Sequence, residues 1–99
     1  MKTEMTNQVE KWAADKNLIP GDPLPQVLKL VEEFGELSKG IQKRDMEEIA
    51  DAIGDCTVVL SILAAQHGLS LEGCREHAWQ RIKHRTGKTV GGVFVKEAC

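Results

Sequence analysis

The chain has 99 residues, of which 41% are hydrophobic and 28% are charged, and its formal net charge at neutral pH is −2. This length suits a single domain over residues 1–99, small enough that oligomerisation would help to complete its core. The charge is too close to zero to indicate a nucleic acid polymer as the partner. No apolar run reaches about 18 residues, the length of a membrane span, and residues 1–10 are too polar for a signal peptide. We therefore expect a cytoplasmic protein that does not contact a membrane.

Apolar periodicity and capping residues predict an all-α fold, a four-helix bundle with a short extended tail. The expected helices run over Thr3–Asn17, Pro25–Lys39, Asp45–Gln66 and Ser70–Thr86. Three carry N-cap candidates, which are Thr3 or Thr6, Asp45 and Ser70. Pro25 suits the first helical position of the second helix, and Gly40 suits its C-cap. The tail, residues 87–99, should pack on the bundle or on a partner chain.

The first expected helix carries Val9, Trp12 and Ala13 on its apolar stripe. Trp12 is then either a core residue or a flat wall on which a nucleobase stacks. The spacing alone does not separate these two interpretations.

The second expected helix carries an acidic ridge of Glu32, Glu33 and Glu36. Residues three and four apart on a helix lie one above another, so these carboxylates share a surface. Lys29, one turn earlier, either forms an ion pair with this ridge or contacts a phosphate. The apolar positions should form the buried face of the helix: Val27, Leu30, Val31, Phe34 and Ile41.

The third expected helix carries a second acidic ridge, formed by Glu48, Asp51 and Asp55. Glu48 stands three residues after Asp45, so the two can form a capping box. Residues 56–65 are apolar nearly all round, which predicts a buried helix with Asp55 at the edge of the core. If the two ridges face each other, their repulsion favours a hard cation between them, and Mg²⁺ is the obvious candidate, with Mn²⁺ as a substitute.

A basic strip is expected on the fourth helix and just after it. Its members are His77, Arg81, His84, Arg85 and Lys88. The strip is either a solvated surface or, beside an acidic metal pocket, the part that holds phosphate groups.

The two acidic motifs and the buried helix after them resemble the MazG-like all-α nucleoside triphosphate pyrophosphohydrolases. The family pattern is E-E-x-x-E, a spacer, and then E-x-x-D, and residues 26–88 look like the family throughout. The ending, residues 82–88 followed by Gly-Val-Phe-Val-Lys at 92–96, is similar to short single-domain members often encoded by phages.

The resemblance implies Mg²⁺-dependent hydrolysis of an NTP or dNTP to the monophosphate and pyrophosphate. Carried over by position, Glu33, Glu36 and Asp55 match metal ligands, and Glu32 is the leading acid of the catalytic motif. One departure concerns the second motif, because Ala52 stands where a glutamate is expected three residues before Asp55.

Two placements of the second motif follow from this departure. Either Asp51 substitutes for the missing glutamate beside Asp55, or Glu48-x-x-Asp51 is the literal motif and Asp55 is an addition. We favour Asp51 with Asp55, because Glu48 already has a role in the capping box.

Phosphate binding is then expected from Lys29, Arg81, Arg85 and Lys88, and base stacking from Trp12. The third helix is apolar on more sides than one short chain can cover, so we expect a homo-oligomer, a dimer or a tetramer. Two rival functions stay open: a non-catalytic helical regulatory module, and the same scaffold acting on another phosphate-linked nucleotide such as an alarmone. No Walker loop is present, which argues against a P-loop enzyme.

Overall fold

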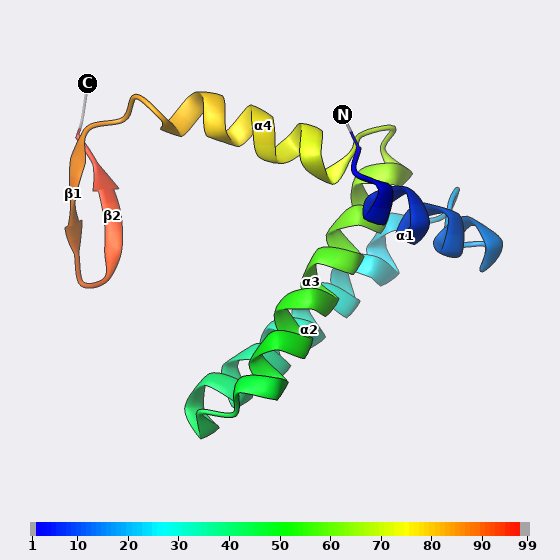
Figure 1. Ribbon diagram of the computed structural model, residues 1–99, viewed down its shortest axis with the longest axis horizontal. Helices are drawn as coiled ribbons and strands as arrows, with labels where there is room; N and C mark the ends of the chain where they lie inside the picture. The colour runs from blue at the N-terminus through cyan, green and yellow to red at the C-terminus, as the bar shows by residue number, and fades with distance from the viewer. Residues whose placement is uncertain (1, 98–99) are drawn as a thin grey trace.

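The computed structural model describes residues 2–97, and two long antiparallel helices are its central feature (Figure 1). Helix α2 (Pro23–Lys43) and helix α3 (Met46–Gln66) lie side by side along their whole length. Helix α1 (Glu4–Asp15) crosses the C-terminal part of α3. No helix among residues 2–97 is both long and apolar enough to cross a membrane.

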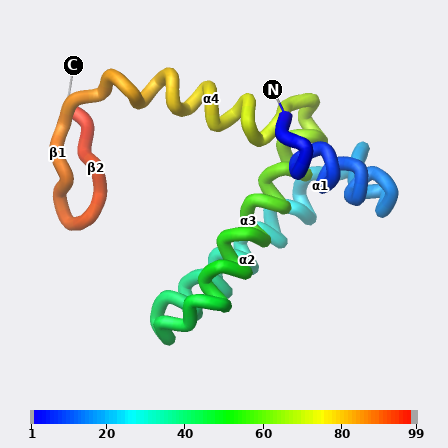
Figure 2. The backbone as a smooth tube through the Cα atoms, in the orientation of Figure 1, coloured from blue at the N-terminus to red at the C-terminus, as the bar shows by residue number. Residues whose placement is uncertain are grey.

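Helix α4 (Leu71–Ile82) begins at the C-terminal end of α3, near the place where α1 crosses, and it points away from the α2–α3 pair (Figure 2). At its far end, β1 (Gly87–Val90) and β2 (Val93–Lys96) form an antiparallel hairpin, in which Thr89 lies opposite Phe94. The radius of gyration is 15.9 Å, whereas a domain of about 100 residues usually has about 13 Å. The expected all-α fold with four helices and an extended tail is confirmed. Of the two expected places for the tail, its described part, residues 87–97, does not take the first, on its own bundle; residues 98–99 lie outside the described residues.

The N-termini of the helices form where the sequence predicts them. The hydroxyl of Thr3 accepts from the backbone N–H of Thr6, Asp45 accepts from that of Glu48, and Ser70 accepts from that of Gly73. Helix α2 begins two residues before Pro25, since Asp22 is its N-cap. Pro23 therefore takes the first helical position, where its missing N–H costs nothing.

The predicted C-cap of α2 is wrong, because the helix continues through Gly40 to Lys43. Arg44 adopts the left-handed conformation instead, with φ of 56°. Gly40 is buried against α3, and a Cβ built on it would lie 3.2 Å from the Cγ1 and from the backbone nitrogen of Ile49. The glycine thus allows α2 and α3 to approach each other.

Helix α4 ends four residues earlier than predicted, at Ile82, and the chain turns before entering β1. Gly91 and Gly92 connect the two strands with φ values of 58° and 81°. Two residues with positive φ make the tight turn whose twist matches that of a hairpin. The Gly-Gly pair is therefore what turns the expected extended segment into two paired strands.

The face that α2 turns toward α3 is not the apolar face that periodicity predicts. Glu33 and Gly40 are the buried residues of α2. The apolar positions Val27, Val31, Phe34 and Ile41 are exposed, at 42% to 60% of their full area. Helix α3 contributes most of the core of this chain: Ala52, Cys56, Val59, Ile62 and Ala64.

A polar contact joins the N-terminus of α1 to that of α4. The Thr6 hydroxyl donates to Oε2 of Glu72 at 2.6 Å, and the Thr3 hydroxyl donates to the same oxygen at 3.1 Å. These bonds favour the charged carboxylate, the Thr6 bond most, and hold the pKa of Glu72 below its usual 4.5. The two hydrogen bonds connect residues that lie 69 and 66 positions apart in the sequence.

This contact makes stability depend on pH in the acid range. A carboxyl group whose pKa is lowered by folding stabilises the fold above its unfolded pKa, and this contribution disappears as pH falls through the folded pKa. We expect the free energy of unfolding to fall below about pH 4.5 more steeply in the wild type than in Glu72→Gln. Urea unfolding between pH 7 and pH 3 measures this, with the exposed Glu76→Gln as control. Identical pH slopes for wild type and Glu72→Gln would contradict the assignment.

Candidate functional site

The register of the α2–α3 pair follows from the residues that the two helices bury. Gly40 lies against Ile49, and Glu33 of α2 and Cys56 of α3 are both buried. The step of seven residues from Gly40 back to Glu33 on α2 therefore matches the step of seven residues from Ile49 forward to Cys56 on α3. In this register Glu36 is level with Ile53, about midway between the levels of Asp51 and Asp55.

The two acidic ridges lie on one side of the helix pair. Glu32 directly precedes the buried Glu33, and Asp55 directly precedes the buried Cys56. Each of the two preceding residues is therefore rotated by about 100° around its own helix axis, in the same direction relative to the chain. Equal rotations in antiparallel helices lead to the same side of the pair. Glu32, Asp51 and Asp55 are exposed on this side. We call it the acidic side.

The ridges differ in burial from what the sequence predicts. Asp55 is exposed, so its expected place at the edge of the core is wrong, although the adjacent Cys56 is buried. The buried carboxylate is that of Glu33, whose side chain is 8% exposed, and that of Glu36 is 48% exposed. The apolar run after Asp55 faces α2 and α1, which leaves the aspartate outside the contact.

Lys29 forms the expected ion pair with the first ridge. Its Nζ lies 3.3 Å from Oε1 of Glu33 and 3.7 Å from Oε1 of Glu32. The hydrogen bond to Glu33 and the charges of both glutamates raise the pKa of Lys29. The lysine thus partly compensates a carboxylate that would be costly to bury alone.

Cys56 is a buried thiol at the contact between α2 and α3. Burial raises its pKa first, and the negative charges of Glu33 and Asp55 raise it further. Cys56 is therefore a protonated core residue at neutral pH and not a nucleophile.

These side chains fit a hard divalent cation by their chemistry. Carboxylate oxygens are the donors that Mg²⁺ and Mn²⁺ prefer. In residues 2–97, no three His, Cys, Asp or Glu side chains are gathered closely enough to hold an ion as they stand. Glu36 leans toward Lys39 instead, with 3.7 Å between Nζ and Oε1. The exposed Glu36, Asp51 and Asp55 have room to change rotamer around the buried Glu33.

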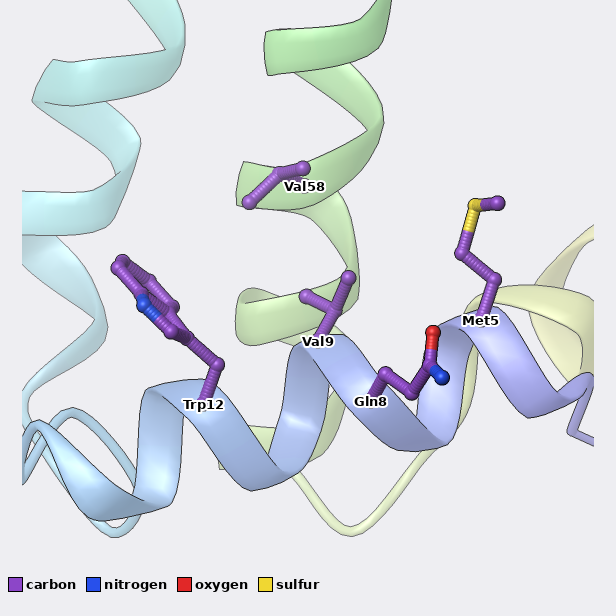
Figure 3. Close-up of a pocket in the computed structure, with 5 residues that line it drawn as sticks. All are labelled: Met5, Gln8, Val9, Trp12 and Val58. Carbon is purple, nitrogen blue, oxygen red and sulfur yellow. The ribbon is translucent and has the colours of Figure 1, made fainter.

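An apolar pocket of about 320 Å³ opens beside the acidic side, between α1 and α3. It is lined by Met5, Gln8, Val9, Trp12 and Val58, and Figure 3 shows the α1 side chains reaching toward the turn of α3 that carries Val58. Trp12 is 53% exposed, which argues against the first of its two interpretations, that of a core residue. Val58 stands one helical turn after Asp55.

Sequence reasoning had found Trp12 but not the rest of this pocket. Val9, Gln8 and Met5 precede it by three, four and seven residues, which places all four on one face of α1. That spacing could have identified the pocket wall. Val58 could not be found in this way, because only the crossing of α1 over α3 brings it there.

Of the four expected phosphate-binding residues, Lys29 lies beside the acidic side, and the other three do not. Arg81 lies near the end of α4, Arg85 lies in the turn after it, and Lys88 lies in β1. All three are exposed, and α4 carries them away from α2 and α3 (Figure 1). The expected helical strip is broken because α4 ends at Ile82.

Comparison with known proteins gives a family match over the part of the chain that carries this site. The family model described as "MazG nucleotide pyrophosphohydrolase domain" matches residues 23–90. The "Uncharacterized 18.2 kDa protein in rep-hol intergenic region" of Haemophilus phage HP1 (strain HP1c1) is 46% identical over 65 residues. That match covers 65% of this chain and 40% of the phage protein, so the chain spans about two fifths of its relative's length. No solved structure matches.

Proposed function

Because the chain belongs to the MazG nucleotide pyrophosphohydrolase family, we propose that it hydrolyses an NTP or dNTP to the nucleoside monophosphate and pyrophosphate. The family match indicates a nucleotide pyrophosphohydrolase in general, of a kind that depends on divalent metal. The triphosphate substrate, the use of Mg²⁺ and a cytoplasmic location are our proposals.

The observation that carries this proposal is the position of the Trp12 pocket relative to the acidic side. Val58 in the pocket wall and Asp55 on the acidic side are three residues apart on α3, about 4.5 Å along the helix axis. In a nucleotide a single sugar joins the flat base to the charged phosphates, so one molecule can contact both the pocket and the neighbouring acidic side. A base against Trp12 would leave its phosphates over Glu32, Glu36 and Asp55.

A metal ion is required there, because triphosphate and carboxylates repel each other. Glu33, Glu36 and Asp55, with Asp51 as the fourth member, would hold Mg²⁺, and Mn²⁺ could substitute for it. When bound, the ion would neutralise phosphate oxygens and lower the pKa of an attacking water. We assign no ligand role to Glu48.

The protein's own groups then have distinct tasks. Trp12 and Val9 would exclude water from one face of the base and orient it. Glu32, 63% exposed and next to the buried Glu33, is the carboxylate left to orient the attacking water and accept its proton. Lys29, whose ammonium lies 3.3 Å from Oε1 of Glu33, would hold that carboxylate in place before the metal binds.

The direct test is a product assay on the purified chain with a panel of NTPs and dNTPs. We expect equimolar monophosphate and pyrophosphate in the presence of Mg²⁺, and loss of turnover with EDTA, because the carboxylates alone cannot neutralise the substrate. Including alarmones in the panel tests the rival substrate class. Release of a diphosphate and inorganic phosphate, or no turnover of any nucleotide with Mg²⁺ or Mn²⁺, would contradict the proposal.

A further inference from the structure

A second cavity, of about 260 Å³, lies where α1, α3 and α4 meet, and we call it the α4 cavity. It shares Met5, Val9 and Val58 with the Trp12 pocket, so the two cavities adjoin along these side chains. Figure 3 shows Met5 at the end of the shared wall that lies away from Trp12. A ligand site usually has at least about 300 Å³. The α4 cavity therefore suits one end of a ligand whose remainder lies against Trp12.

The α4 cavity contains polar groups of a kind that the Trp12 pocket lacks. They are four hydroxyl groups, one carboxylate and one guanidinium: Thr3, Thr6, Thr57, Ser61, Glu72 and Arg75. Thr6 and Ser61 are only 5% and 4% exposed, so these groups belong to the interior of the junction and not to a solvated surface. The hydrogen bonds that they already make decide what a ligand could add.

The four hydroxyl groups have no hydrogen left for a ligand. Those of Thr3 and Thr6 donate to Oε2 of Glu72. The hydroxyl of Thr57 donates to the backbone carbonyl three residues earlier, at 2.7 Å, and that of Ser61 donates to the carbonyl of Thr57, at 2.9 Å. Because a hydroxyl has one hydrogen, all four can only accept further hydrogen bonds.

The carboxylate of Glu72 has one oxygen without a partner. Oε2 accepts from the two threonines, whereas Oε1 is buried and has no hydrogen-bond partner among residues 2–97. The pKa of Glu72 lies below its usual 4.5, so at neutral pH the group is ionised and can only accept. A buried oxygen without a donor is unfavourable. An N–H group of a ligand would satisfy it.

Arg75 supplies a donor beside this acceptor. It stands three residues after Glu72 on α4, so the two side chains lie on neighbouring positions of one helix face. Arg75 is exposed, and no carboxylate of the described chain lies within 4 Å of its guanidinium. A guanidinium only donates. The cavity therefore presents one free acceptor and one free donor side by side.

We propose that the α4 cavity binds the polar edge of the base and selects nucleotides whose base carries an amino group beside an unprotonated ring nitrogen, as cytosine and adenine do. This step rests on the proposed function and names its substrate class. The amino group would donate to Oε1 of Glu72, and the ring nitrogen would accept from Arg75. Uracil and hypoxanthine have a carbonyl and an N–H at these positions, so acceptor would face acceptor and donor would face donor.

Two pairs of substrates isolate the amino group. CTP differs from UTP, and ATP from ITP, in exchanging the amino group and ring nitrogen for a carbonyl and an N–H. We expect kcat/KM to be at least about tenfold higher for CTP than for UTP and for ATP than for ITP, because the unfavoured base leaves the buried Glu72 oxygen unsatisfied. Hydrolysis of all four at equal kcat/KM would overturn the selection and leave the proposed function standing.

Variants of the two groups test their roles through the ratio of kcat/KM for CTP and UTP, which cancels a loss of folded protein. In Glu72→Gln, the threonine hydroxyls would hold the amide oxygen and leave the NH₂ in place of Oε1. This NH₂ can donate to the uracil carbonyl, so the ratio should fall toward one. Arg75→Met, at an exposed position that does not endanger the fold, should also lower the ratio. Glu76→Gln, which does not line the cavity, should keep it. An unchanged ratio in Arg75→Met, or in folded Glu72→Gln, would overturn the proposal.

Binding of free nucleosides decides the question without any hydrolysis. Trp79→Phe leaves Trp12 as the sole tryptophan, so its fluorescence reports whether the adjoining cavities are occupied. Cytidine should quench this fluorescence at about a tenth of the uridine concentration, or less. Equal quenching by both nucleosides, or quenching by neither, would overturn the proposal. A chain that hydrolyses no nucleotide but still distinguishes cytidine from uridine would contradict the proposed function alone.

Discussion

Replacing Glu36 by glutamine or Asp55 by asparagine is expected to abolish nucleotide hydrolysis while the helices persist. The amides keep the shape of the carboxylates but lose the charge that would hold Mg²⁺, and loss of one such group costs on the order of 100-fold or more in turnover. Both side chains are exposed, and among residues 2–97 the one ion-pair partner of Glu36 is Lys39, at 3.7 Å. The effect on stability should therefore be within about 0.5 kcal/mol.

The measurements are pyrophosphate release, Mg²⁺ binding by calorimetry and helix content by circular dichroism. Asp15→Asn is the matched control, because Asp15 is an exposed aspartate on α1 that pairs only with Lys11, at 3.0 Å. It should keep full turnover and metal binding. If Glu36→Gln or Asp55→Asn retained wild-type turnover, the acidic side would not be the catalytic site.

The sequence predicted the local elements well because capping is a local property. Thr3, Asp45 and Ser70 each stand beside the N–H groups they cap, so the chemistry is complete within a few residues. Gly40 misled the prediction for the opposite reason. Its role is set by Ile49 on another helix, and periodicity along α2 carries no information about that contact.

The burial of α2 could be predicted only in part. Periodicity tells which residues share a face, but it does not tell whether the partner of that face belongs to the same chain. Val27, Val31 and Phe34 do share a face, as predicted, yet this face is exposed and Glu33 is buried instead. The prediction was therefore right about which residues share a face and wrong about the burial of that face.

The candidate site could likewise be predicted from the sequence only in part. The acidic ridges were predicted because helical spacing is enough to bring carboxylates to one surface. Whether Glu48 or Asp55 completes the second metal-binding motif could not be decided in this way, because both stand at helical steps from Asp51. The register of α3 against α2 favours Asp55, which lies nearer than Glu48 to the level of Glu36.

Glu48 takes part in the N-terminal cap of α3, and Asp51 does not. Only half of the predicted capping box forms. Asp45 accepts from the backbone N–H of Glu48 at 3.2 Å. The reciprocal bond is not made, since the N–H of Asp45 donates to the carbonyl of Gly40 at 3.0 Å. The carboxylate of Glu48 instead lies 3.8 Å from the Nζ of Lys43, near the loop that joins the helices.

Asp51→Asn is therefore expected to lose most activity, and Glu48→Gln is expected to keep it. In the α2–α3 register, Asp51 lies about two residues, or 3 Å, from the level of Glu36, and Glu48 lies about five residues, or 7.5 Å, away. Only Asp51 can then share an ion with Glu36 and Asp55, so its amide should lower turnover on the order of 100-fold and weaken Mg²⁺ binding. Side-by-side kinetics and calorimetry of the two variants measure the difference. An inactive Glu48→Gln beside an active Asp55→Asn would instead establish Glu48-x-x-Asp51 as the metal-binding motif, and the ion would then lie closer to the α2–α3 loop.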